Sequence, residues 1–73
     1  MGSTSKDVRK QICANIKRVR EQKGLTQEEV AKEAGMSSNY FAKIERGEPG
    51  AAPEKIYAII KALKVDASEI FPS

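Results

Sequence analysis

The chain contains no histidine and no tryptophan, and its only cysteine is Cys13. A single cysteine excludes an intramolecular disulfide, and without histidine there is no cluster of the residues that usually bind zinc. The sequence offers no pairing of a nucleophile with a general base and no glycine-rich phosphate loop. We therefore expect neither an enzyme nor a metal or cofactor site.

Long apolar runs are also missing. No stretch approaches the roughly 18 residues that a membrane-spanning helix needs, and no secretion signal is visible. These absences favour a soluble protein of the cytoplasm.

The chain is short and only mildly basic. Its 73 residues suffice for one small domain, and a chain of this size buries only about 60% of the surface of its unfolded state. Lysine and arginine number 13 against 10 acidic residues, giving a net charge of +3. Much of the positive charge falls within residues 1–23, so its distribution is more informative than its total.

Apolar residues recur with the 3.6-residue period of an α-helix. In the first such stretch they are Val8, Ile12, Ile16 and Val19. We expect a first helix that is capped by Thr4 or Ser5 and runs to about Lys23. Cys13 lies beside its buried face, where a small semi-buried hydrophobe is a commoner role for cysteine than a redox centre.

Two short helices follow, joined by a tight turn. Thr26 is typical of a helix N-cap, and Glu29, three residues later, completes a capping box. Gly35 breaks the pattern, because glycine readily adopts the positive φ that ends a helix. Ser37 then caps a second helix, which ends at Gly47. Two helices held by such a short turn form a helix-turn-helix.

Residues 48–52 form a loop, and Pro53 suits the first position of a fourth helix. The inward face of that helix is expected to consist of Ile56, Ile59, Ile60 and Leu63. Asp66 and Glu69 form a further cap-like pair, which predicts a short fifth helix that ends before Pro72. The sequence thus predicts an all-α domain of five helices over residues 6–73. Residues 1–5 are expected to be disordered or left over from cloning.

The segments GLTQEEVAKEAGMSSNYFAKIERG and PEKIYAIIKALKVDASEIF resemble the phage-repressor-like (Cro-like, XRE) helix-turn-helix regulators. The resemblance covers roughly residues 12–71. It implies a repressor-like domain that binds specific double-stranded DNA as a small transcriptional regulator, with a recognition helix at about 37–46 in the major groove. Controller proteins of restriction-modification systems and phage repressors share this plan.

The recognition helix offers side chains suited to base edges. Asn39 can bond adenine in bidentate fashion, Lys43 can reach guanine or a phosphate, and Ser38 discriminates weakly. We expect these three to contact bases. Tyr40 is expected at a phosphate, although a thymine methyl or a packing role suits it equally. The remaining expected phosphate contacts are Gln27, Ser37 and Arg46.

The resemblance also implies a structural ion pair between Arg20 and Glu45, which would tie the first helix to the third. The loop 48–52 departs from the family pattern, in which this loop is often basic, because it contains no lysine or arginine. We therefore expect few phosphate contacts per subunit and a strong dependence on dimer binding to a pseudo-palindrome.

The surface left for a homodimer is C-terminal. The residues expected there are Tyr57, Ile60, Ile70 and Phe71. If these side chains are exposed they form the interface, and if they are buried they only close the core. No small-molecule effector site is evident. The alternative function is a protein-interaction module of the antitoxin or coactivator type on the same scaffold.

Overall fold

The computed structural model describes residues 5–72 and consists of helices. The elements are α1 (Ser5–Gln22), α2 (Gln27–Ala34), α3 (Ser38–Glu45), α4 (Pro53–Leu63) and the 3₁₀-helix η1 (Ala67–Glu69). No strand occurs within this range. Ser5 is the first residue of α1. The rest of the segment expected to be disordered, residues 1–4, lies outside the described residues, and so does Thr4 as a possible helix cap. No helix within residues 5–72 is both long and apolar enough to cross a membrane.

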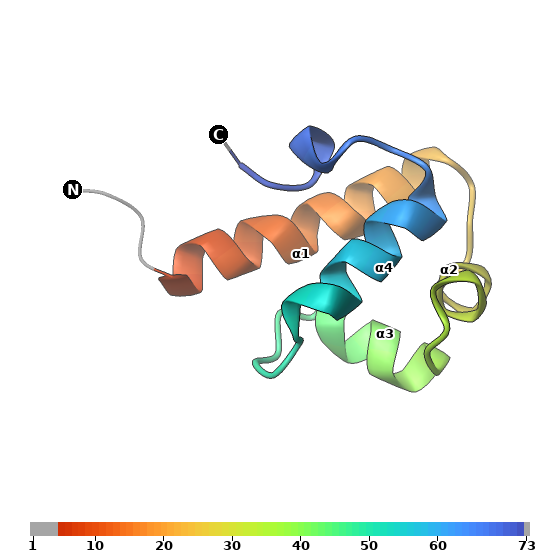
Figure 1. Ribbon diagram of the computed structural model, residues 1–73, viewed down its shortest axis with the longest axis horizontal. Coiled ribbons are helices and arrows are strands. Elements are labelled where there is room, and N and C mark those ends of the chain that lie inside the picture. Colours follow the sequence, from red (N-terminus) through yellow and green to blue (C-terminus); the bar gives the residue numbers. More distant parts are fainter. Residues whose placement is uncertain (1–4, 73) are drawn as a thin grey trace.

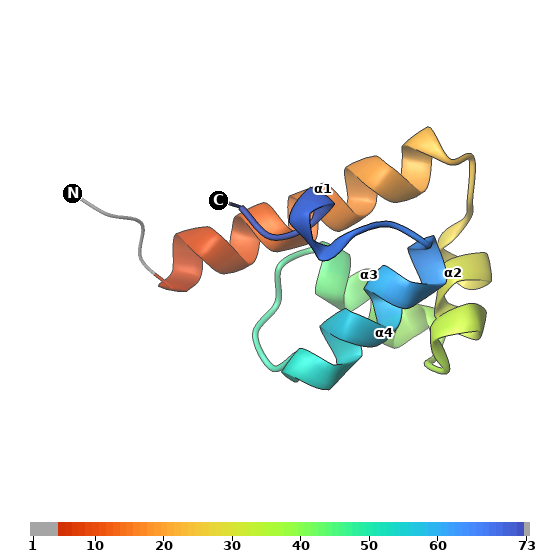
Figure 2. The same cartoon turned by 45° about the horizontal axis from the view of Figure 1, so that its top comes forward.

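The helices enclose one core. α1 is the longest helix and extends along one side of the molecule, with α4 packed against it, while α2 and α3 close the remaining side (Figure 1). α2 packs on both α3 and α4, and α3 also contacts α1. After α4 the chain turns back, so that η1 lies over the middle of α1 (Figure 2). This arrangement leaves one side of α3 uncovered.

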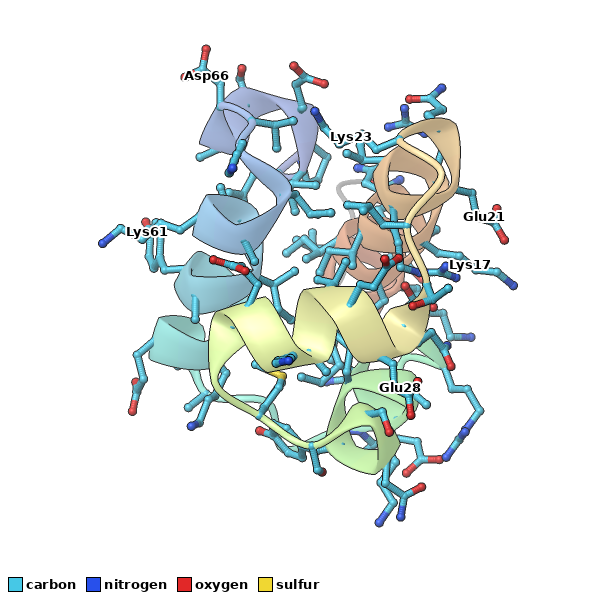
Figure 3. All side chains as sticks on the ribbon, turned by 90° about the vertical axis from the view of Figure 1, so that its right-hand side faces the viewer. Lys17, Glu21, Lys23, Glu28, Lys61 and Asp66 are labelled. Carbon is cyan, nitrogen blue, oxygen red and sulfur yellow. The ribbon has the colours of Figure 1, made fainter. Side chains whose placement is uncertain are left out.

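The core combines residues from all these segments. Its buried apolar members are Cys13, Ile16, Val19, Val30, Ala31, Phe41, Ile44, Ile59, Ile60, Leu63 and Ile70. The charged side chains labelled in Figure 3 point away from this core. Burial of each large apolar side chain in this core stabilises the fold by about 1.5–3 kcal/mol before conformational entropy is counted. A small domain therefore depends on nearly all of them.

The predicted capping signals of the helix-turn-helix are confirmed. The Thr26 hydroxyl accepts from the Glu29 amide at 3.0 Å, and the Glu29 carboxylate accepts from the Thr26 amide at 2.8 Å. Gly35 has a φ of 76°, and the Met36 amide donates to the Ala31 carbonyl at 2.9 Å. The turn between the two helices is therefore fixed by backbone hydrogen bonds at its start and its end.

The predicted fifth helix is one 3₁₀ turn instead of an α-helix. The Glu69 and Ile70 amides donate to the carbonyls three residues earlier, both at 3.0 Å. Asp66 makes no side-chain capping bond in this fully described turn, so the expected cap pair with Glu69 was wrong. The segment between α4 and Pro72 is too short to repay the nucleation of a longer helix. It is held instead by the Asn15 side-chain amide, which donates to the Ile70 carbonyl at 2.8 Å.

Candidate nucleic-acid interface

The uncovered side of α3 carries the three residues expected to contact bases. Ser38 and Asn39 lie in the first turn, Lys43 lies one turn later, and all three are exposed. Phe41 and Ile44, on the opposite side of the same helix, are buried to 0% and 2% exposure. Because the helix is short and one side is fully packed, its polar side must face outwards.

The start of α3 is capped as expected. The Ser37 hydroxyl accepts from the Tyr40 amide at 3.1 Å. Ser37 itself is exposed, whereas Tyr40 is half-buried and packs against the core. The packing role considered for the Tyr40 ring is therefore present, and its phosphate contact stays a prediction.

A buried ion pair fixes α3 against α1. The Arg20 Nε atom donates to Glu45 Oε2 at 2.7 Å, and Nη2 donates to Glu45 Oε1 at 3.2 Å. The side chains of Arg20 and Glu45 are only 11% and 3% exposed. Arg20 also donates to the Leu25 carbonyl at 2.7 Å. The hydrogen bond to Glu45 is the main cause of the raised pKa of Arg20, so this residue stays charged at any working pH.

Gln27 joins this pair from the first turn of α2. Its side-chain amide donates to Glu45 Oε1 at 2.9 Å, so α1, α2 and α3 meet at one carboxylate. The sequence did not reveal this bond. The Gln27 amide nitrogen is thus engaged in the free protein, and the expected phosphate contact of Gln27 remains a prediction.

Arg46 lies directly after α3 and has an acidic neighbour. Its Nε atom donates to Glu48 Oε2 at 3.0 Å, and its Nη2 atom lies 2.9 Å from the same oxygen. Both side chains are about half exposed, at 57% and 47%. Gly47, between them, has a φ of 81°, a left-handed conformation that glycine adopts at little steric cost. Sequence reasoning missed this ion pair.

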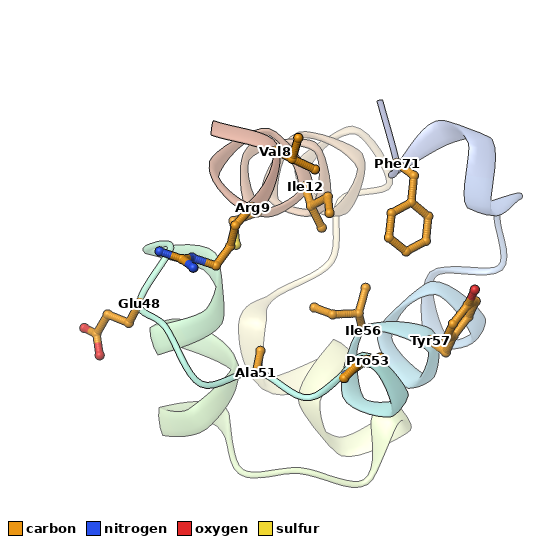
Figure 4. Close-up of a pocket in the computed structure, with 10 residues that line it drawn as sticks. Val8, Arg9, Ile12, Glu48, Ala51, Pro53, Ile56, Tyr57 and Phe71 are labelled. Atoms are coloured by element: carbon orange, nitrogen blue, oxygen red, sulfur yellow. The ribbon is translucent and has the colours of Figure 1, made fainter. Parts of the chain in front are cut away.

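A second surface lies between α1 and α4 and extends to the loop that follows α3. It is an apolar groove of about 550 Å³ whose lining includes Val8, Ile12, Ala51, Ile56, Tyr57 and Phe71. Figure 4 shows the aromatic rings at one end of the groove and the charged side chains of Arg9 and Glu48 at the other. The Tyr57 and Phe71 ring centroids are 6.0 Å apart.

Only part of the expected dimer surface is accessible. Tyr57 is 56% exposed and Phe71 is half-buried. Ile60 and Ile70 are 5% and 0% exposed, so these two close the core and do not form an interface. The spacing of apolar residues in α4 could not distinguish a core residue from an interface residue. It identifies the apolar face of the helix but does not show whether this protein or a second copy covers that face.

Arg9 was not singled out from the sequence. Its Nε atom is buried and has no hydrogen-bond partner among residues 5–72. An uncompensated buried donor is rare in folded proteins. Cys13, in the same groove, is 4% exposed and belongs to the core, and this burial is the main cause of its raised thiol pKa.

The chain has clear relatives. It is 39% identical over 64 residues to the uncharacterized HTH-type transcriptional regulator y4dJ of Sinorhizobium fredii, an alignment that covers 88% of this chain and 83% of that protein. Among solved structures, the restriction-modification controller protein C.AhdI from Aeromonas hydrophila superposes with a TM-score of 0.80 at 29% identity. That alignment covers 89% of this chain and 97% of C.AhdI.

A further solved structure is the controller protein C.Esp1396I, a tetramer in complex with its natural 35-base-pair operator. It matches with a TM-score of 0.74 and 28% identity over 88% of this chain and 82% of that one. The helix-turn-helix family matches residues 16–70, which include α2, α3 and α4. With its exposed α3 and capped turn, the chain belongs to the XRE-type helix-turn-helix family of DNA-binding transcriptional regulators.

Proposed function

We propose that this protein is a sequence-specific repressor that places α3 in the major groove of double-stranded DNA and binds as a homodimer. The observation that carries the proposal is the polar, exposed side of α3, presented by a helix whose other side is buried. A helix held in this way can enter the groove with little loss of conformational entropy on binding.

Asn39 and Lys43 are the side chains best suited to read sequence. They are four residues apart on α3, so both project from the same side of the helix. Asn39 can pair with N6 and N7 of adenine, and Lys43 can donate to O6 or N7 of guanine. Ser38, in the same first turn, adds a weaker contact.

The flanking residues suit the phosphates. Ser37 and Arg46 stand at the two ends of α3, and Gln27 stands at the N-terminus of α2, where backbone amides favour an anion. Tyr40 can add its hydroxyl. Such contacts fix the register of the protein on the duplex without reading its sequence.

The face that bears Tyr57 and Phe71 is proposed as the dimer interface. It combines a largely exposed aromatic ring with an apolar groove, at the end of the groove opposite Glu48 (Figure 4). Aromatic residues are enriched in protein interfaces. Two copies paired in this way can place their recognition helices in successive major grooves about 34 Å apart.

The test is a selection of bound duplexes from random DNA, followed by titration of the selected sequence and a scrambled duplex. We expect a palindromic sequence that binds much more tightly than the scrambled one. If no sequence is enriched, and binding is weak and salt-sensitive, the proposal fails and a protein-interaction module becomes the better account.

A further inference from the structure

Arg46 already holds an anion on the side of the protein proposed to face DNA. Glu48 Oε2 lies 3.0 Å and 2.9 Å from two nitrogens of the guanidinium. Loop 48–52 contains no lysine or arginine, so it supplies no second cation to offset this carboxylate. A phosphate that approaches Arg46 therefore meets a side chain that is already neutralised.

We propose that Glu48 is an internal competitor of the DNA phosphate for Arg46, and that it lowers the affinity of the protein for DNA of any sequence. This inference rests on the proposed function, because it assumes that Arg46 contacts a phosphate. Glu48 thereby keeps binding to random DNA weak and leaves discrimination to the side chains of α3.

The exposure of the pair makes such an exchange possible. Both side chains are about half exposed, and ion pairs of this kind are weak in water. A duplex carries a dense row of phosphates, so it can displace a single carboxylate. The displacement still costs affinity, because the Arg46–Glu48 pair must open before Arg46 can hold a phosphate.

The experiment is a double-mutant cycle with Glu48→Gln, Arg46→Gln and the double variant, each titrated with a selected and a scrambled duplex. Glu48→Gln keeps the size of the side chain and removes its charge. We expect it to tighten binding to both duplexes about threefold, as the loss of a competing surface ion pair allows. In the Arg46→Gln background the same change should have little effect, since no guanidinium remains to be released.

Glu69→Gln is the matched control, because it removes the same charge from η1, which packs over α1 on the side remote from α3 (Figure 2). We expect it to leave affinity nearly unchanged. An equal gain from Glu69→Gln, or an undiminished gain from Glu48→Gln without Arg46, would show general charge repulsion and overturn the inference. Failure of the unmodified protein to bind any duplex would instead overturn the proposed function.

Discussion

The Glu45 carboxylate shows how a single residue determines the position of α3. It accepts hydrogen bonds from Arg20 on α1 and Gln27 on α2 while belonging to α3. A nearly buried charge is tolerated only where partners replace the lost water. The same network that stabilises the fold therefore orients the surface proposed to read DNA.

Arg20→Met should lower the free energy of unfolding by about 3–5 kcal/mol, because it leaves the Glu45 charge buried with only Gln27 as a partner. Chemical denaturation measures this change. Lys17→Met on the exposed side of α1 is the control, and we expect a change within about 0.5 kcal/mol. A similar loss from both variants would show that Arg20 acts by helix propensity or packing.

Cys13 predicts a pH effect. Burial raises its pKa in the folded protein, so the unfolded chain gives up the thiol proton first as the pH rises above about 8.5. The contribution of the neutral buried thiol to the free energy of unfolding is thus fully present at neutral pH and decreases in mildly alkaline solution. We expect the difference in free energy of unfolding between the wild-type protein and Cys13→Ala to become smaller from pH 7 to pH 9 and pH 10, as measured by chemical denaturation. A difference that is constant with pH would contradict this account.

The helix boundaries illustrate what local sequence can determine. Thr26, Glu29, Gly35 and Ser37 predicted the two starts and the turn of the helix-turn-helix, because capping depends on neighbours within four residues. The last element was misjudged as a helix with a cap. The conformation of this last element depends on the shortness of the segment after α4 and on the hydrogen bond from the distant Asn15 side-chain amide. Local sequence signals reveal neither.

The end of α4 offers a prediction at this scale. Lys64 adopts the left-handed conformation with a φ of 59°, which is costly for a residue with a Cβ atom. Lys64→Gly should therefore raise the free energy of unfolding by about 0.5–1 kcal/mol, measured by thermal or chemical denaturation. Lys61→Gly, inside the same helix, should lower it by about 1 kcal/mol. Destabilisation by both variants would refute the strain assigned to Lys64.

At the scale of the whole molecule, the proposed DNA-binding residues lie on α3, and Tyr57 of the proposed dimer surface lies on α4. The sequence pattern predicted the all-α helix-turn-helix domain, and the family resemblance implied the Arg20–Glu45 pair. Neither separated Tyr57 from Ile60 as interface residues, since Tyr57 lies at the edge of the apolar stripe of α4 and only tertiary packing decides which side chain is covered. The Arg46–Glu48 ion pair was missed because an exposed arginine can pair with any acidic side chain within reach, and the sequence does not show which one lies close.

Tyr57→Asp tests the proposed dimer. Tyr57 is largely exposed, so the change should leave the fold intact while placing a charge in the interface. Sedimentation should show a shift from dimer to monomer, and affinity for the selected palindrome should fall at least tenfold as the two half-sites uncouple. Gln22→Glu at the far end of α1 alters the charge equally and should change neither property. An unchanged dimer in Tyr57→Asp would move the interface elsewhere.

The central claim is that α3 reads base edges, and the affinity of Asn39→Ala for a selected and a scrambled duplex tests it most directly. Asn39 is exposed and caps nothing, so its loss should leave folding unaffected, which circular dichroism can verify. We predict a loss of about 1–3 kcal/mol on the selected duplex and much less on the scrambled one. Equal losses on both duplexes would contradict base readout by Asn39 and with it the role assigned to α3.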